Sequence, residues 1–363
     1  MSDLFSPIEL RNGSVLPNRL AVAPMTTTQS NADGSVSEAD LIWLNRLASD
    51  GYGMVITCAA AISKDSIAFP NELSAGSDAM LPGLTKLAAR LKHHRGAMVV
   101  QLCHGGSRTI PELTGTAACG PSRYRDPRRP VRTPPKELSK PQIAHIIEDF
   151  ANASARVAKA GFDGVEIHGA NGYLITQFVS PTTNLRDDEF GGSLANRARF
   201  AREVVRACRN KVPEGFVIGI RLSFESGGMR TKLDIDENIQ IMNWLIEDGV
   251  DYAHISQWDL AEKSSKYPEK VALEYIHEKA DRRVPLICAG GVTSVSDATK
   301  LRGFGADIVA VGRAAIGNAR IPERFARGEA LAPLPFAEED LAKVGVSLEF
   351  ISYLKKGHMD VVK

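Results

Sequence analysis

Cysteine is scarce in this 363-residue chain, and its five cysteines are scattered with no Cys-x-x-Cys pair. That spacing argues against a disulfide framework, a zinc site and an iron–sulfur cluster, so we expect no metal site. No apolar run approaches the roughly 20 residues that span a bilayer, and the N-terminus lacks the features of a signal peptide. The sequence therefore predicts a cytoplasmic protein with no membrane partner.

An excess of charge of one sign is also missing. The chain has 44 Lys and Arg against 43 Asp and Glu, a formal net charge of +1. This balance gives no electrostatic reason to expect a nucleic-acid partner. A G-x-G-x-x-G turn is absent after the first apolar run, which continues instead into Pro24 and Met25. Its absence weakens the case for an open, doubly wound nucleotide-binding sheet.

Eight apolar runs are present, and each is followed by a segment with helical periodicity. Runs that are apolar almost throughout are typical of parallel strands buried on both faces. Eight strand–helix units predict a (β/α)8 barrel, the TIM-barrel fold of the α/β class, rather than an open sheet. The runs occupy residues 18–25, 52–61, 96–105, 162–170, 216–223, 250–257, 284–291 and 306–313.

Local signals mark the ends of several elements. Ser139 and Gln142 form a capping box for a helix over 140–160, and Gly161 ends it. Asn12-Gly13 predicts a hairpin within 8–20 that closes the bottom of the barrel. Other helices are expected over 39–49, 80–93, 235–248 and 296–303, and from near 194.

We expect one domain over 1–363, with the barrel at 18–330 and a helical tail at 336–363. The segment 120–141 is rich in Pro and Arg and predicts a long connection after the third strand. Long connections on this side of a barrel are often lids or substrate walls. A plain surface loop explains the composition equally well.

The stretch from Glu166 to Tyr173 follows Val165 in the fourth apolar run and crowds three polar groups into six residues. His168 and Asn171 can donate hydrogen bonds to one oxygen, and Tyr173 can deliver a proton nearby. These groups can polarise a carbonyl and protonate the neighbouring carbon. The structural alternative is a strand end with a capping Asn and a half-buried Tyr.

Other strand ends suit a planar cofactor with a phosphate tail. Gly291 ends the seventh run and Gly312-Arg313 ends the eighth, and barrels often bind phosphate at these two strands through backbone N–H groups. Gln101 and Arg221 lie at the ends of two other runs. An acceptor-rich flavin edge would satisfy a buried Arg221, and so would an internal ion pair.

The chain, from the first run to the turn after the eighth, resembles the Old Yellow Enzyme family of FMN-dependent oxidoreductases. The most specific resemblance covers residues 166–200, and the turns Pro24-Met25-Thr26, Gly290-Gly291-Val292 and Val311-Gly312-Arg313 agree in order and spacing. The resemblance implies a tightly bound, non-covalent FMN. It assigns the cofactor contacts to Ala23, Pro24, Met25, Thr26, Ala59, Gln101, Arg221, Gly291, Gly312 and Arg313.

The same resemblance implies the chemistry. NADPH or NADH reduces the flavin, which then reduces the activated C=C bond of an α,β-unsaturated carbonyl or nitro compound. His168 and Asn171 match the pair that grips the substrate oxygen, and Tyr173 matches the proton donor. Thr28, Trp258 and Tyr267 are further candidates to line the substrate pocket.

Two departures leave the substrate pocket undetermined. Some bacterial members carry Cys at the position of Thr26, Tyr at Thr28 and His at Asn171, whereas this chain is closer to the yeast-like branch at these positions. Its compact length is nevertheless closer to the bacterial branch. The scattered cysteines and the end at Lys363 lead us to expect no appended iron–sulfur or second flavin domain.

Two other enzyme classes compete with this interpretation. One is a flavin-dependent demethylase or dehydrogenase on the same scaffold, and the other is a cofactor-free, phosphate-binding lyase or isomerase barrel. The His168–Asn171 pair favours a carbonyl or nitro ligand over a demethylase substrate. The eight runs show neither the Lys nor the paired carboxylates expected of the third class. The sequence leaves a homo-oligomer open.

Overall fold

Eight parallel strands close into a barrel in the computed structural model, which describes residues 3–125, 133–225, 232–357 and 360–363. The ring order is β3, β13, β12, β11, β10, β9, β6 and β4, and β4 pairs back with β3. The predicted (β/α)8 barrel is confirmed. The strands are β3 (Leu20–Val22), β4 (Met54–Ala61), β6 (Ala97–Cys103), β9 (Gly164–Gly169), β10 (Val217–Leu222), β11 (Tyr252–Ser256), β12 (Leu286–Ala289) and β13 (Ile308–Val311).

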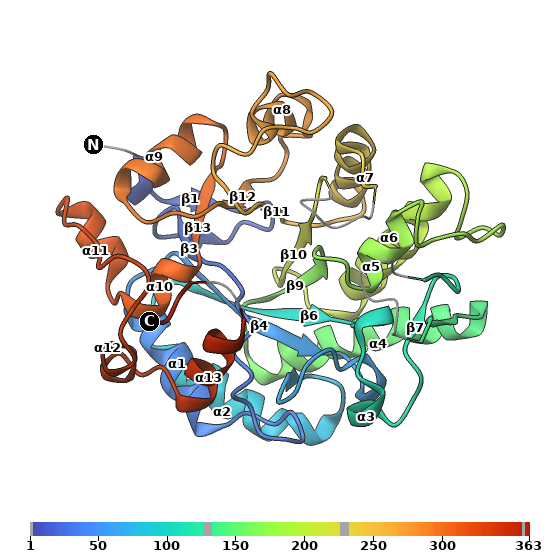
Figure 1. The fold of residues 1–363 in the computed structure, drawn as a ribbon, viewed down its shortest axis with the longest axis horizontal. Helices are drawn as coiled ribbons and strands as arrows, with labels where there is room; N and C mark the ends of the chain where they lie inside the picture. Colours follow the sequence, from blue (N-terminus) through green and yellow to red (C-terminus); the bar gives the residue numbers. More distant parts are fainter. Residues whose placement is uncertain (1–2, 126–132, 226–231, 358–359) are drawn as a thin grey trace.

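Helices surround the barrel (Figure 1). The longest, α4 (Lys140–Ala160), has the predicted bounds: the Ser139 backbone N–H donates to Gln142 Oε1 at 3.0 Å, and Gly161 ends the helix at φ +97°. The others are α1 (Glu38–Ser49), α2 (Leu81–Leu91), α3 (Pro111–Thr114), α5 (Leu174–Val179), α6 (Leu194–Lys211), α7 (Ile235–Glu247), α8 (Ala272–Lys279), α9 (Val295–Gly303), α10 (Arg313–Gly317), α11 (Ile321–Ala326), α12 (Glu338–Lys343) and α13 (Leu348–Lys356), with 3-10 turns η1 (Asp3–Phe5), η2 (Lys64–Ser66), η3 (Asp78–Met80) and η4 (Gly106–Arg108).

A hairpin closes the bottom of the barrel, as the Asn12-Gly13 signal predicts. β1 (Ile8–Glu9) pairs antiparallel with β2 (Val15–Leu16), and Gly13 turns the chain at φ +86°. Leu10 and Leu16 are buried and join the apolar cluster of the barrel interior, which includes Ala21, Met54, Val99, Val217 and Ile308. The hairpin therefore fills the amino end of the barrel, and the carboxyl end is left for a ligand.

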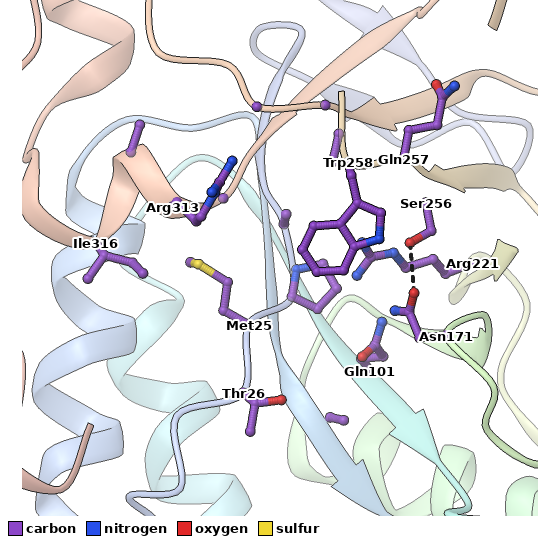
Figure 2. A pocket seen from close by; sticks show the side chains of 18 of the residues that line it. Met25, Thr26, Gln101, Asn171, Arg221, Ser256, Gln257, Trp258, Arg313 and Ile316 are labelled. Carbon is purple, nitrogen blue, oxygen red and sulfur yellow. Dashed lines mark hydrogen bonds between the residues drawn. The ribbon is translucent and has the colours of Figure 1, made fainter. Parts of the chain in front are cut away.

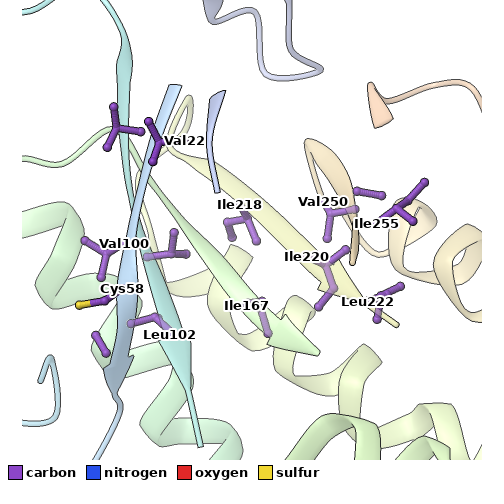
Figure 3. Packing of buried hydrophobic residues seen from close by; sticks show 14 of the residues in the cluster. Val22, Cys58, Val100, Leu102, Ile167, Ile218, Ile220, Leu222, Val250 and Ile255 are labelled. Carbon is purple, nitrogen blue, oxygen red and sulfur yellow. The ribbon is translucent and has the colours of Figure 1, made fainter. Parts of the chain in front are cut away.

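Alternate residues of each strand face outward and pack under the helices. Figure 3 shows Val100, Ile167 and Ile220 from neighbouring strands among these buried side chains. Because side chains alternate along a strand, the residues between them face the barrel interior. Interior positions near the carboxyl ends are polar, and they contribute to the site below.

The Pro- and Arg-rich connection is described only at its ends. Cys119–Gly120 (β7) pairs parallel with Lys136–Glu137 (β8), and the Arg186 guanidinium donates to the backbone oxygens of Pro121 and Leu138. The predicted features at Pro127, Arg128, Arg129, Pro130 and Arg132 lie outside the described residues.

β5 (Leu73–Ser74) pairs with the end of β4, outside the closed ring. In the described ranges, no helix has the length and apolarity needed to cross a membrane.

Candidate active site

A cavity of about 440 Å³ lies at the carboxyl ends of the strands. Figure 2 shows its lining, with side chains from many separate strands and loops pointing into one space. Every residue predicted to contact a cofactor lines it, namely Ala23, Pro24, Met25, Thr26, Ala59, Gln101, Arg221, Gly291, Gly312 and Arg313. His168, Asn171, Tyr173 and Trp258 line it as well. The fold thus brings the two predicted groups of residues together.

The strand order sets the two ends of the cavity. β9, which carries His168, and β13, which leads into Gly312 and Arg313, stand four strands apart in a ring of eight. They are therefore on opposite sides of the barrel mouth. Gln101 and Arg221 come from β6 and β10, which flank β9. A ligand that reaches both groups must extend across the mouth.

His168 is placed to donate a hydrogen bond into the cavity. Its side chain is 4% exposed, and burial together with the positive charges of Arg221 and Arg108 lowers the pKa of the imidazole well below its usual value. The ring is therefore neutral at pH 7. Nδ1 accepts from the backbone N–H of Ala170 at 3.4 Å, so Nε2 carries the proton.

Asn171 is oriented by contacts on three of its polar groups. Its backbone N–H donates to Ser223 Oγ at 3.0 Å, and its backbone oxygen accepts from Arg108 Nη1 at 2.6 Å. These contacts hold the residue at φ +58°, a conformation that Asn tolerates. Its side-chain oxygen accepts from Ser256 Oγ at 3.3 Å (Figure 2), which leaves the amide nitrogen as a donor for the cavity.

Tyr173 lies beside His168 and Arg108. The centroid of its phenol ring is 4.8 Å from the centroid of the His168 ring. The guanidinium carbon of Arg108 lies 4.5 Å from the centroid of the same phenol ring. Burial raises the pKa of Tyr173, an effect that the charge of Arg108 opposes. The phenol is therefore protonated at neutral pH. Arg108 contacts both Tyr173 and Asn171, and the sequence interpretation missed it.

The barrel end next to β9 fits an acceptor-rich ring edge. Arg221 is buried, lines the cavity, and has an Nε with no hydrogen-bond partner in the described structure. An orphaned donor of this kind is costly unless a ligand supplies an acceptor. The charge of the nearby Glu166 carboxylate raises the Arg221 pKa, but desolvation is the larger effect and lowers it. The internal ion-pair alternative therefore accounts for only part of this residue's environment.

The opposite end fits a phosphate. A Cβ built on Gly291 would have Trp258 O at 3.4 Å and Arg313 Nη2 at 3.9 Å as its nearest neighbours. A Cβ on Gly312 would meet only Ala23 Cβ, at 3.9 Å. The space beside both glycines is therefore open to a ligand, and the Arg313 guanidinium adjoins it. A planar cation of this kind suits phosphate recognition.

Two predicted pocket residues are not brought into the cavity. Thr28 is two residues past Thr26, but the backbone turns there at φ +50° and Thr28 is not among the lining residues. The Tyr267 hydroxyl donates to Asp236 at 2.8 Å, and its ring packs on Tyr275 with centroids 4.7 Å apart. Both side chains lie outside the wall that the sequence assigned to them.

Some lining residues carried no signal in the sequence. Ser256, at the end of β11, and three residues of α13 complete the wall; these three are Phe350, Tyr353 and Leu354. Phe350 packs edge-on against Trp43 at 5.3 Å and fixes the helix there. No group of three or more possible metal ligands occurs among the residues that the structure describes.

Comparisons with known proteins agree with this geometry. Residues 3–331 match the NADH:flavin oxidoreductase / NADH oxidase family. The chain belongs to this family. It is 37% identical to a probable NADH-dependent flavin oxidoreductase, YqiG, of Bacillus subtilis, over 85% of this chain and 84% of that protein. It is 36% identical to an NADH:fumarate oxidoreductase of Klebsiella pneumoniae, over 90% of this chain but only 36% of that protein.

A solved structure of an Old Yellow Enzyme homologue from Zymomonas mobilis superimposes with a TM-score of 0.82 and 25% identity, over 94% of this chain and 96% of that one. The resemblance to Old Yellow Enzyme is thus confirmed. Family membership makes this chain a flavin-dependent NAD(P)H oxidoreductase with FMN as its cofactor. It removes the cofactor-free lyase or isomerase alternative.

Proposed function

We propose that this member of the family reduces the activated C=C bond of α,β-unsaturated carbonyl or nitro compounds. The observation that carries the proposal is the convergence of two hydrogen-bond donors, on His168 and Asn171, next to a protonated Tyr173. Two donors aimed at one oxygen stabilise negative charge that builds there. An amine, which a demethylase would oxidise, has no carbonyl or nitro oxygen for this pair to hold.

We also propose how the cofactor lies. Gln101 and Arg221 would hold the pyrimidine edge of FMN, Ala59 would pack on the ring, and Gly291, Gly312 and Arg313 would hold the phosphate. The segment Ala23, Pro24, Met25 and Thr26 would lie along the ring, and Thr26 would donate a hydrogen bond near its reactive edge. The open space beside both glycines and the orphaned Arg221 Nε support this orientation.

FMN, when bound, would supply the redox chemistry, which is hydride transfer from NADPH or NADH to the β-carbon of the alkene. The protein positions the substrate and handles the proton. His168 Nε2–H and the Asn171 amide N–H hold the carbonyl or nitro oxygen and stabilise its growing charge. Tyr173 gives its phenolic proton to the α-carbon, and a positioned donor of this kind contributes about 10²–10⁴-fold in rate. Trp258 stands at the mouth, 64% exposed, where it can contact the substrate.

The two half-reactions test the proposal. Purified protein loaded with FMN should be yellow, should bleach with NADPH or NADH without oxygen, and should recolour when 2-cyclohexenone or a nitroalkene is added. Recolouring by oxygen alone, with enones and nitroalkenes both inert, would contradict it. If neither oxygen nor an alkene restored the colour, the result would point to the dehydrogenase alternative. In that case an amine should bleach the oxidised protein.

A further inference from the structure

A layer of polar side chains fills the barrel interior directly below the cavity. At its centre, the Glu166 carboxylate of β9 accepts from Gln101 Nε2 at 2.7 Å, from His254 Nδ1 at 2.9 Å and from the Tyr252 hydroxyl at 3.2 Å. Glu166, His254 and Tyr252 are fully buried, and Gln101 is 2% exposed. The proton chemistry proposed above uses none of these contacts.

Glu166 is ionised in this layer. Burial by itself would raise the pKa of the carboxyl, but His254, Arg221 and the hydrogen bond from Gln101 together hold it below the usual value. Burial lowers the pKa of His254, so its ring is neutral and donates through Nδ1. A single negative charge therefore lies under the cavity, next to the positive charge of Arg221.

The packing around Glu166 leaves its position little freedom. Gly219 on β10 is in register with Glu166 on one side and with Tyr252 on the other. A Cβ at Gly219 would lie 2.0 Å from Tyr252 Cζ, so only glycine leaves room for that ring. The ring crosses this space and brings its hydroxyl to Glu166. The layer is therefore held by packing as well as by hydrogen bonds.

The contact to Glu166 determines what Gln101 offers a ligand. A glutamine amide has a donor end and an acceptor end, and here the nitrogen donates to the carboxylate. The oxygen is left for the cavity, which Gln101 lines. Arg221, two strands away around the ring, lines the same cavity, and its buried Nε–H has no hydrogen-bond partner among the described residues. An acceptor near a cationic donor complements an imide, in which an N–H stands beside a carbonyl.

We propose that Glu166 is a positioning residue with two effects: it fixes the Gln101 amide with its oxygen toward the imide of the flavin, and it offsets part of the Arg221 charge. The first effect makes the site selective for a flavin with a free N3–H. The second keeps the reduction potential of the flavin low, because reduction adds electron density near Arg221. The inference rests on the proposed placement of the pyrimidine edge.

Glu166→Gln tests both effects with little change in shape. The variant loses the negative charge, so the midpoint potential of bound FMN should shift to a more positive value. The new amide can donate or accept, so Gln101 is free to turn. Wild-type apoprotein should bind N3-methyl-FMN at least about tenfold more weakly than FMN, the loss of one hydrogen bond to a buried partner. In E166Q the ratio of the dissociation constants of N3-methyl-FMN and FMN should approach one.

Two further variants separate the effects. Glu166→Asp keeps the charge but withdraws the carboxylate from Gln101, so the selectivity should fall while the potential stays. Gln101→Met should abolish the selectivity, and adding Glu166→Gln to it should still raise the potential. As a control, Tyr252→Phe removes one donor and keeps the carboxylate, so both readouts should stay close to the wild-type values.

An E166Q protein with the wild-type potential and the wild-type ratio of affinities would overturn the inference. If E166Q does not fold, E166D decides, and unchanged selectivity in E166D overturns the role of Glu166 in orienting Gln101. Either result leaves the proposed function standing, provided that wild-type protein takes up FMN and is recoloured by an enone. Failure of the wild-type protein in that assay would instead overturn the proposed function.

Discussion

Tyr173 has the environment of a group that must keep its proton until a carbon accepts it. It is 8% exposed, beside His168 and under Arg108. Tyr173→Phe keeps the ring and removes the proton, so alkene reduction should slow by about 10²–10⁴-fold. Reduction of the flavin by the nicotinamide should change little. Anaerobic stopped-flow measurement of each half-reaction checks this, and equal losses in both would show that Tyr173 is not the donor.

The pH dependence of alkene reduction follows from the same two side chains. Burial lowers the pKa of His168 and raises that of Tyr173. His168 therefore becomes neutral at a pH below its ordinary pKa of about 6.5 and stays neutral at higher pH. Tyr173 keeps its proton at pH values above its ordinary pKa of about 10. The rate of the alkene half-reaction should be flat between about pH 7 and pH 9. A change in this rate with a midpoint at about pH 6.5, absent in His168→Asn, would contradict the prediction. It would show that the His168 imidazole gains a proton near its ordinary pKa.

Single residues also mark what the sequence could and could not predict. His168, Asn171 and Tyr173 share one short segment, so local order was enough to group them. Glu166 and His254 looked like parts of apolar strands, because a parallel strand is buried on both faces and hides which face is the barrel interior. Their contact joins residues 88 apart in sequence, and only closure of the barrel brings them together.

At the scale of elements, local signals predicted boundaries well. α4 and the hairpin follow from caps and a turn that act within a few residues, and the other expected helices start or end within about two residues of the observed bounds. The position of α13 over the cavity has no local cause. It depends on Phe350 meeting Trp43 and on Ser347 donating to Gln29 Oε1 at 3.0 Å.

The attachment of α13 leads to a prediction about the cavity wall. A nine-residue helix is not stable alone in water, so its packing decides whether it stays folded. Phe350→Ala removes a fully buried ring and should cost about 3–5 kcal/mol of local stability. Amides 348–356 should then exchange hydrogen faster, and the KM for the alkene should rise. Ser352→Ala, at an exposed site on the same helix, is the matched control. Unchanged exchange in Phe350→Ala would show that another contact holds α13.

At the scale of the whole molecule, the closed ring fixes the distance between the two ends of the site. β9 and β13 are opposite each other only because β4 pairs back with β3. An open sheet with the same strands would separate Arg313 from Gln101 along its length. The alternation of strands and helices predicted this closure, and with it the side of the barrel that binds ligand. The sequence did not show which interior residues meet across it.

A ligand without the phosphate tests whether the cofactor reaches across the barrel mouth to Arg313. Free FMN at one hundred times its Kd should stabilise the apoprotein by about 2.7 kcal/mol, seen as a higher unfolding midpoint. Riboflavin has the ring without the phosphate and should stabilise it less at the same concentration. Arg313→Ala should remove most of that difference, because the guanidinium beside Gly291 would no longer be there to bind the phosphate. Arg320→Ala, an exposed arginine paired with Glu323, should keep the difference. An Arg313→Ala protein that still prefers FMN to riboflavin as strongly as wild type would place the phosphate elsewhere in the barrel mouth.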